Sequence, residues 1–483
     1  MVNLTIVQAW WNRKSEHMTH HNAEPIGWDR HAAAVGRVRA QLAALPSGAP
    51  VRLAKRTSNL FRPREDMGAQ GLDVSCLAGV VEVDPASRVA QVQGMCTYET
   101  LVDATLAHGL MPYVVPQLKT ITLGGAVTGL GIESSSFRNG LPHESVRELD
   151  ILTGSGEILT ATDDNAHRDL FRAFPNSYGS LGYSVRLMID LEPVQPHVRL
   201  RHVRFTSVPS LVDTLEKILA TREFEGHHVD FIDGVVFSAD ESYLVIAHFT
   251  DSTPPYTSDY TGRRIYYRSI QGWHEDFLTI RDYIWRWDTD WFWCSRGLFV
   301  QKPLVRRVIP KRYLRSDVYG KVIRFENRHG WYAALQQRRG ALPQERVVQD
   351  VEIPIERTAE FVDWFLTNVP IEPIWLCPIR LRDTSHGVRP WPHYPLEAGR
   401  DYVNVGFWSA VPIVPSAADG DVNKAIEHKV HALDGHKSLY SDAYYDQDEF
   451  WSLYGGEEYA RVKKLYDPDG RLPDLYAKAV GRR

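Results

Sequence analysis

The stretch TLGGAVTGLGIESSS, residues 122–136, carries four glycines within eight positions and ends in three consecutive serines. Glycine lets a backbone approach its neighbour closely and adopt positive φ. Exposed N–H groups followed by small hydroxyls suit an oxygen-rich anion such as a pyrophosphate. The stretch therefore predicts a phosphate-binding loop, with a glycine-rich turn between packed elements as the alternative.

Bulk composition limits the class of protein. A chain of 483 residues predicts two or three domains, and 43% hydrophobic with 24% charged residues is typical of a globular enzyme. The net charge of −5 gives no global field for nucleic acid. The four cysteines lie far apart without a CxxC pair, so we expect no metal site, no disulfide framework and a reducing compartment.

No segment is typical of a signal peptide, and no apolar run approaches the ~20 residues of a spanning helix. We therefore expect a cytoplasmic protein, at most peripheral on the inner face of a membrane.

Short strands and helices alternate along the chain and predict an α+β fold. A helix is expected at 28–45, and strand, turn, strand and a helix capped near Thr97 at 80–109. Paired strands are expected at 231–238 and 243–250, and buried strands at 374–381 and 402–409. The predicted units are a loose N-terminal extension at 1–25, a first domain at 26–195, a second at 196–410 and a C-terminal segment at 411–483.

Three segments in order, AKRTSNLF (54–61), TLGGAVTGLGIESSS and GSLGYSVRLMIDLEP (179–193), resemble the flavin-binding segments of the PCMH-type, or vanillyl-alcohol-oxidase, FAD family. The turn YDPDGRL (466–472) is similar to that family's closing turn. Four further segments resemble the Δ24-sterol reductase (seladin-type) branch: VVQDVEIPIE, PIWLCPIRL, YVNVG and LYSDAYYDQDEFW. The resemblance implies a two-subdomain FAD-binding domain, an α+β substrate (cap) domain and a C-terminal segment that packs back near the flavin.

The resemblance also implies which residues bind FAD. They are Arg56, Thr57, Ser58 and Asn59 at the pyrophosphate; Gly124, Gly125, Thr128, Gly129 and Gly131 beside the ribityl chain and isoalloxazine; Ser134, Ser135 and Ser136 as hydroxyl donors; and Val185 at the adenine edge through its backbone. A Rossmann fold is rejected because GAVTGLG lacks the GxGxxG spacing. Relatives that tether FAD use a histidine or a cysteine where this chain has Asn59 and no cysteine between 97 and 293. We therefore expect non-covalent FAD and a reductase or dehydrogenase.

Enzymes of this branch reduce an isolated carbon–carbon double bond. The resemblance implies that an acid first protonates the alkene, that an electron-rich pocket stabilises the resulting carbocation, and that flavin N5 then donates hydride. Tyr440 and Glu133 are the predicted catalytic acids, with Tyr444 and His143 as weaker candidates and Glu352 interpreted as an edge-strand carboxylate. Within the aromatic block 283–300, Trp291 and Trp293 are predicted to line the substrate pocket; core packing is the alternative.

The segment 302–328 holds nine Lys or Arg against two acids. It is either a solvated face or a site for anionic phospholipid or for the phosphates of a nicotinamide donor. No nucleic-acid reading motif accompanies it.

The animal sterol reductases carry an N-terminal membrane segment that we do not find here. The chain resembles bacterial 10-methylene-fatty-acyl reductases of the tuberculostearic acid pathway, which use NADPH and act after a SAM-dependent methyltransferase. We therefore expect a lipid substrate, NADPH as donor and that methyltransferase as a possible partner. A Δ24-sterol or isoprenoid alkene reductase, an oxygen-dependent polyol or alcohol oxidase and a non-enzymatic flavin-binding protein stay open.

Overall fold

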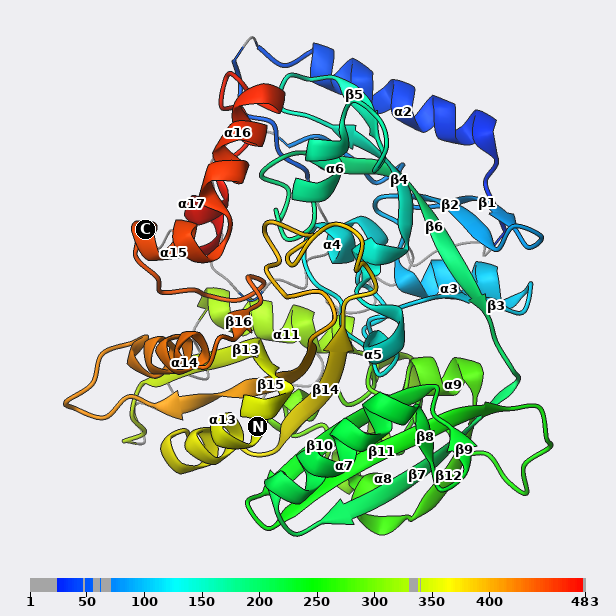
Figure 1. The fold of residues 1–483 in the computed structure, drawn as a ribbon, viewed down its shortest axis with the longest axis vertical. Coiled ribbons are helices and arrows are strands. Elements are labelled where there is room, and N and C mark those ends of the chain that lie inside the picture. The colour runs from blue at the N-terminus through cyan, green and yellow to red at the C-terminus, as the bar shows by residue number, and fades with distance from the viewer. Residues whose placement is uncertain are drawn as a thin grey trace.

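The computed structural model describes residues 24–46, 48–54, 61, 71–329, 338 and 340–480. Two antiparallel β-sheets organise this part of the chain, one in the upper and one in the lower half of Figure 1. The α+β class expected from the sequence is confirmed. None of the helices within these ranges combines the length and the apolar character that crossing a bilayer requires.

The first sheet has the strand order β1-β2-β6-β4-β5, with β3 paired to β6. Its strands are β1 (Val80–Asp84), β2 (Val89–Gln93), β3 (Leu110–Pro112), β4 (Val146–Leu152), β5 (Ile158–Ala161) and β6 (Tyr183–Pro193). Helices α2 (Trp28–Ala43), α3 (Tyr98–Leu106) and α6 (Arg168–Ala173) pack around it. The predicted cap is confirmed, because the Thr97 hydroxyl accepts a hydrogen bond from the Thr100 N–H at the start of α3.

The first part of the glycine-rich stretch is helical, and residues 129–135 continue without regular secondary structure. The helical part forms α4 (Leu123–Thr128), capped by the Thr122 hydroxyl, and α5 (Ser136–Asn139) follows. None of the four glycines of the stretch has positive φ, so that expectation was wrong. The expectation of close approach is confirmed at Gly124, where an added Cβ would lie 2.1 Å from Ser184 Oγ and 2.6 Å from the Gly94 carbonyl oxygen. Gly124 is therefore needed to seat α4 against β2 and β6.

The second sheet has the order β12-β7-β11-β10-β14-β15-β13-β16. Its strands are β7 (His197–Phe205), β10 (Phe231–Ser238), β11 (Glu241–Thr250), β12 (Glu275–Thr279), β13 (Gln344–Pro354), β14 (Ile374–Arg380), β15 (Asp401–Pro412) and β16 (His436–Lys437). The predicted strands at 231–250, 374–381 and 402–409 are confirmed. A separate short hairpin joins β8 (Glu223–Phe224) to β9 (His227–His228).

Alternation along the strands gives this sheet two different faces. On β14, Ile374 and Leu376 belong to a core shared with α7 (Val208–Thr221), α13 (Ile355–Asn368) and α14 (Asp421–Ala432). Trp375 and Cys377 instead belong to a core continuous with the first sheet. Successive side chains of a strand point to opposite faces. The inner face of the second sheet therefore meets the first half of the molecule.

The remaining helices connect or cover these sheets. They are α8 (Tyr266–Gly272), α9 (Ile280–Ile284), α10 (Pro303–Val308), α11 (Ser316–His329), α15 (Gln447–Leu453), α16 (Gly456–Tyr466) and α17 (Leu475–Ala479). The C-terminal helices return to the first half: Lys463 Nζ donates to the Ser180 carbonyl at 2.7 Å and Lys478 Nζ donates to that of Tyr178 at 2.8 Å.

The first sheet ends at Pro193 and the second begins at His197, next to the predicted division at 195. The second sheet continues past residue 410, because β15 runs to Pro412 and β16 adds a further strand. The division into domains stays a prediction.

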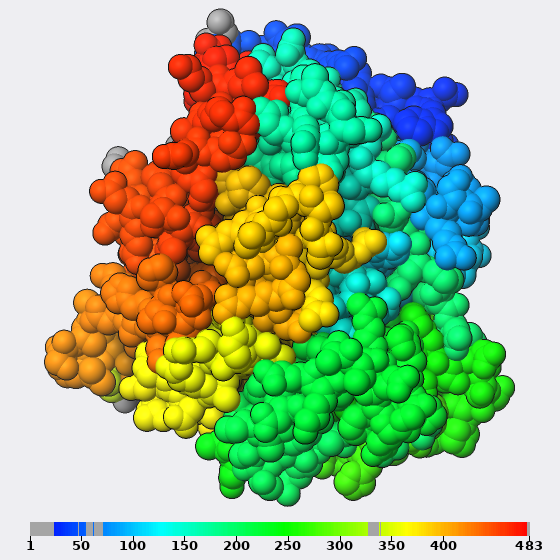
Figure 2. Space-filling view, viewed as in Figure 1, coloured from blue at the N-terminus to red at the C-terminus, as the bar shows by residue number. Residues whose placement is uncertain are grey.

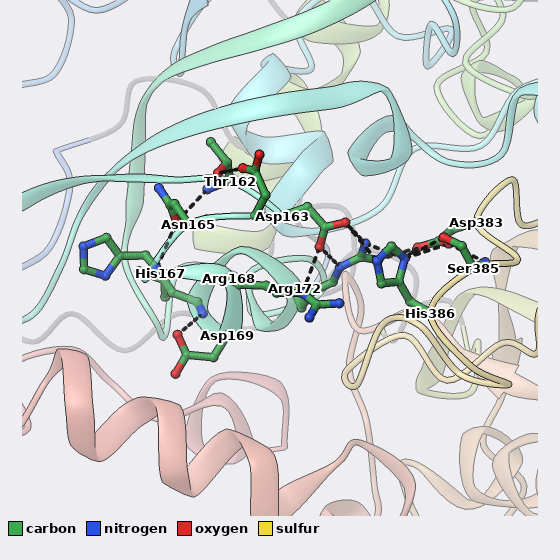
Figure 3. Close-up of polar contacts among 12 residues, drawn as sticks. Thr162, Asp163, Asn165, His167, Arg168, Asp169, Arg172, Asp383, Ser385 and His386 are labelled. Atoms are coloured by element: carbon green, nitrogen blue, oxygen red, sulfur yellow. Dashed lines mark hydrogen bonds and ion pairs between the residues drawn. The ribbon is translucent and has the colours of Figure 1, made fainter.

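An ion-pair cluster ties the connection after β14 to the first half (Figure 3). Arg172 of α6 pairs with both Asp163 and Asp383, and His386 Nε2 lies 3.1 Å from Asp163. Ser385 Oγ and the Asp383 carboxylate share the same His386 nitrogen, Nδ1, so the group lacks the geometry of a hydrolytic triad. It acts as a clip, and Figure 2 shows the gold segment that it holds lying across the junction of the two halves.

Candidate active site

A cavity of about 820 Å³ lies between the two halves of the molecule. One wall is the glycine-rich stretch with the neighbouring residues Pro116 to Thr122. The other wall is the inner face of the second sheet, supplied by β13, β14 and β15. A volume of this size falls within the range of ligand sites, and junctions between domains are where such sites occur.

The glycine-rich wall has the character that a dinucleotide cofactor needs. Five predicted FAD residues line the cavity, namely Gly124, Gly125, Thr128, Gly129 and Gly131. Among the described residues, the buried Gln117 Nε2 has no hydrogen-bond partner, and Gln117 also lines the cavity. Arg52 and Lys478 add positive charge to the lining. An unsatisfied amide donor, two cations and a bare backbone fit a flavin with its pyrophosphate.

Ser134, Ser135, Ser136 and Val185 are absent from the described lining of the cavity. Arg56, Thr57, Ser58 and Asn59 lie outside the described residues. The Ser134 hydroxyl contacts Tyr283 Oη at 2.8 Å, that of Ser135 donates to the Tyr113 carbonyl, and that of Ser136 accepts from the Glu133 N–H. The serine run is therefore buried and satisfied by protein groups, and the structure places it away from the cavity.

Val185 stays a predicted contact of the adenine edge through its backbone. Its side chain is buried in the small core beneath α2, and its carbonyl accepts a hydrogen bond from the Gly94 N–H at 3.0 Å. Its neighbours Tyr183 and Ser184 line the cavity instead.

Glu133 is a buried ion-pair partner rather than a cavity acid. Its Oε1 lies 3.2 Å from Arg286 Nη2, which also contacts Asp233 at 3.0 Å. Burial raises the pKa of Glu133, and the Arg286 charge opposes that rise. Glu133 is absent from the cavity lining within the described ranges, so it does not face the cavity in which FAD is expected.

The weaker acid candidates also lie elsewhere. His143 packs against Trp391 at 4.5 Å between ring centres, and burial lowers the pKa of His143 to about 3. Tyr444 packs against Gly420, away from the cavity lining.

Aromatic rings form the end of the cavity at the second sheet. Trp291 lines it as predicted and stacks with Phe61 at 5.9 Å. Trp293 does not line the cavity; it lies behind Trp408, 5.6 Å from it. Phe292 of the same aromatic block also lines this end, together with Trp375 and Trp408, which the sequence analysis did not assign.

The turn that presents these rings is unusual. Trp291, Phe292 and Trp293 have φ of 48°, 47° and 60°. Three successive non-glycine residues in the left-handed region cost roughly 1–2 kcal/mol each. Such conformations persist where the surrounding packing determines them, and they cluster at functional sites. The turn explains why Trp291 and Phe292 reach the cavity while Trp293 packs behind it.

Asp350 is the one acidic residue in the described cavity lining. Its Oδ1 accepts a hydrogen bond from Asn404 Nδ2 at 2.9 Å, and burial raises its pKa to about 6. Gly406 is its cross-strand partner, and an added Cβ there would lie 2.5 Å from Asp350 Oδ1. The absent side chain at 406 therefore makes room for the carboxyl group.

Tyr440, a predicted catalytic residue, lies beside Asp350 in the same wall. Its hydroxyl accepts a hydrogen bond from Trp408 Nε1 at 2.8 Å, and the Asp350 carboxyl group lies close enough to act on it electrostatically. Burial and the Asp350 charge raise the pKa of Tyr440 well above its ordinary value. A hydroxyl and a protonated carboxyl group side by side in an aromatic enclosure can act as a general acid.

Asp350 was missed by the sequence analysis although a signal was present. In VVQDVEIP the aliphatic residues of one face, Val347, Val351 and Ile353, alternate with Asp350 and Glu352 on the other. Glu352 is not an edge carboxylate, because β16 pairs with β13 at this position and Ser438 Oγ donates to Glu352 at 2.7 Å. Two carboxyl groups on the buried inner face indicate a polar site there.

Comparisons with known proteins agree with this site. A family model described as an FAD binding domain matches residues 37–162. The chain is 26% identical over 420 residues to the Delta(24)-sterol reductase of Mus musculus, covering 83% of this chain and 76% of that protein. It is 23% identical to the Delta(24)-sterol reductase of Arabidopsis thaliana, covering 84% and 76%. It is 31% identical over 160 residues to cytokinin dehydrogenase 7 of Oryza sativa subsp. japonica, covering 33% of this chain and 29% of that protein.

The matched FAD domain contains the glycine-rich stretch, and the similarity to the sterol reductases covers most of the chain. The chain is an FAD-dependent oxidoreductase with an FAD-binding domain of the PCMH type, and it resembles the branch of that family that includes the Δ24-sterol reductases.

Proposed function

We propose that this protein reduces an isolated carbon–carbon double bond in a lipid, namely the methylene group of a 10-methylene fatty acyl chain, to give the 10-methyl chain. NADPH is the proposed donor. The proposal rests on one observation: Asp350, the single acid of the described cavity lining, lies with Tyr440 at the aromatic end of the cavity. An isolated alkene has no carbonyl group to polarise, so its reduction requires an acid of this kind.

Asp350 and Tyr440 would hold the proton and deliver it to the terminal =CH2 carbon. That carbon becomes a methyl group, and the positive charge moves to the tertiary carbon of the chain. The faces of Trp291, Phe292, Trp375 and Trp408 would stabilise this charge, by about 2 kcal/mol for a desolvated ring. Bound FAD, once reduced, supplies the hydride that completes the saturated chain.

The sterol reductases among the relatives support alkene reduction as the class of reaction. A Δ24-sterol also gives a tertiary cation on protonation, so the cavity chemistry suits both lipids. The acyl substrate is preferred from the resemblance to bacterial acyl reductases. In that setting a SAM-dependent methyltransferase supplies the methylene lipid, and the enzyme works in the cytoplasm, peripherally at the inner membrane face.

An anaerobic reduction tests the proposal. The FAD-loaded protein is mixed with NADPH, and loss of the visible flavin absorbance is recorded. A phospholipid with a 10-methylene acyl chain is then added, and reoxidation of the flavin is followed with mass analysis of the acyl product. Stoichiometric 10-methyl product supports the proposal, whereas reoxidation only by a Δ24-sterol would move the substrate to that rival. Reoxidation only by oxygen, with peroxide formed from a sugar alcohol, would refute alkene reduction.

A further inference from the structure

Large apolar side chains project into solvent from one short segment of the second half. Phe299 is 49% exposed, Leu304 80% and Val308 78%. Leu304 and Val308 are four residues apart on α10 and therefore lie on the same side of that helix. Lys302 Nζ lies 4.9 Å from the centre of the Phe299 ring, which joins Phe299 to this group. We call Phe299, Lys302, Leu304, Arg307, Val308, Lys311 and Arg312 the α10 face.

The charge of the α10 face is positive throughout. Lys302, Arg307, Lys311 and Arg312 are exposed, and no acidic residue occurs between Phe299 and Ser316. Within the described ranges, none of these four cations forms an ion pair with an acidic side chain. The four side chains keep their positive charge available at the surface.

Two other basic residues of the segment are used inside the protein. Arg306 is buried, donates to the Arg263 carbonyl at 2.6 Å and contacts Asp290 at 3.4 Å. Arg315 pairs with Glu99 at 2.7 Å. The basic residues of this segment therefore have two roles. Arg306 and Arg315 hold the segment in place, and the exposed cations face outward beside the apolar side chains.

The segment that carries the α10 face also packs against the cavity wall. Val300, Leu314 and Tyr319 form one cluster with Trp291, and Trp291 lines the cavity. The Tyr319 hydroxyl donates to the Thr289 carbonyl at 3.0 Å. The exposed face and the aromatic end of the cavity are thus two sides of one small packed unit.

We propose that the α10 face docks on an anionic lipid bilayer. Apolar side chains interleaved with long cationic ones are suited to the boundary between headgroups and acyl chains. Each cation near an anionic membrane contributes about a fivefold gain in partitioning. Nicotinamide phosphates would use the cations but leave Leu304 and Val308 unexplained. Docking does not depend on the reaction. Its role in delivering a lipid to the cavity rests on the proposed function.

Vesicle flotation tests the docking with the FAD-loaded protein and no substrate. Binding is measured to vesicles of phosphatidylglycerol mixed with phosphatidylcholine and to vesicles of phosphatidylcholine alone. Leu304→Glu/Val308→Glu removes the apolar contacts, and Arg307→Gln/Arg312→Gln removes two cations. Val388→Glu/Leu465→Glu is the matched control, because it makes the same two replacements at side chains that are 66% and 59% exposed on other elements. Melting curves and flavin absorbance check the fold of each variant.

We expect the wild type and the control to float with anionic vesicles but not with phosphatidylcholine. The cation variant is expected to bind about 30-fold more weakly, and the apolar variant to lose flotation. Equal binding by all variants, binding to neutral vesicles as strong as to anionic ones, or displacement by NADPH would overturn the proposal. None of these outcomes depends on turnover, so failure of docking and failure of the proposed reaction are distinguishable.

Discussion

Replacing Asp350 by asparagine separates the roles of this residue in catalysis and in stability. Asparagine keeps the size of the side chain and can still accept the hydrogen bond from Asn404. It cannot donate a carboxylic proton, however. Because general acids contribute roughly 10²–10⁴-fold to turnover, we expect Asp350→Asn to lower alkene turnover by about that factor with FAD binding retained.

The pH profile gives a sharper measure of the same substitution. The pKa of Asp350 is about 6, so the carboxyl group is protonated below pH 6 and about one-tenth protonated at pH 7. Wild-type turnover under substrate saturation should therefore fall about tenfold per pH unit above pH 6. The Asp350→Asn variant should lack this limb.

Asp350→Asn should lower turnover but raise the stability of the protein relative to the wild type at neutral pH. Burial raises the pKa of Asp350 from 3.8 to about 6, so the folded state holds this proton more tightly than the unfolded chain. The resulting stabilisation is complete below about pH 4 and is lost as the pH rises through 6; at about 1.4 kcal/mol per pH unit, the loss amounts to about 3 kcal/mol. Asp350→Asn removes this ionisation, so its melting temperature relative to wild type should rise between pH 5 and pH 8.

Glu352→Gln is the matched control, because Glu352 lies two residues away on the same face and burial also raises its pKa, but it does not line the cavity. It should change stability with pH and leave the turnover profile intact. Wild-type turnover, or a wild-type pH limb, in Asp350→Asn would refute the assignment of Asp350 as the acid.

Three further predictions concern the surroundings of the site. Gly406→Ala would place Cβ 2.5 Å from Asp350 Oδ1, and we expect turnover to fall at least tenfold with a loss of about 1–3 kcal/mol in stability; unchanged steady-state rates would contradict this. Burial raises the pKa values of Asp163 and Asp383, but their contacts with Arg172 and His386 outweigh it and hold both pKa values below the ordinary value. The stability that these two carboxylates contribute is therefore present above about pH 4 and is lost as the pH falls further. Arg172→Met should flatten that acid-side loss in melting temperature, and an identical slope would count against the clip. Burial raises the pKa of the Cys294 thiol to about 12, which disfavours thiolate attack on the flavin, so acid precipitation should release all FAD into the supernatant; flavin in the pellet would show a covalent bond.

The sequence patterns predicted elements well where local chemistry decides them. The Thr97 cap and the strands at 231–250 follow from the capping residue and from β-branched and aromatic runs, which act over a few residues. The bare backbone at Gly124 was also interpreted correctly as a close approach. Its neighbour turned out to be Ser184, however, and no local pattern indicates which strand a helix will meet.

The site itself depends on contacts between distant segments. Trp291, Asp350, Trp408 and Tyr440 come together only because β13 and β15 pair and the chain after β16 crosses their inner face. The serines at 134–136 were assigned to a ligand because hydroxyls suit phosphate; they suit buried carbonyl groups equally well, and the fold decides between the two. Trp293 was assigned with Trp291, but a left-handed turn sends the two rings to different sides.

A crystal structure of the chain with FAD tests the central claim most directly. The account predicts FAD in the cavity between the two sheets, against Gly124–Gly131 and Gln117, with its ring system in the half that holds Asp350 and Tyr440. A flavin bound elsewhere, or a cavity closed by the protein's own side chains in the FAD-loaded form, would contradict it.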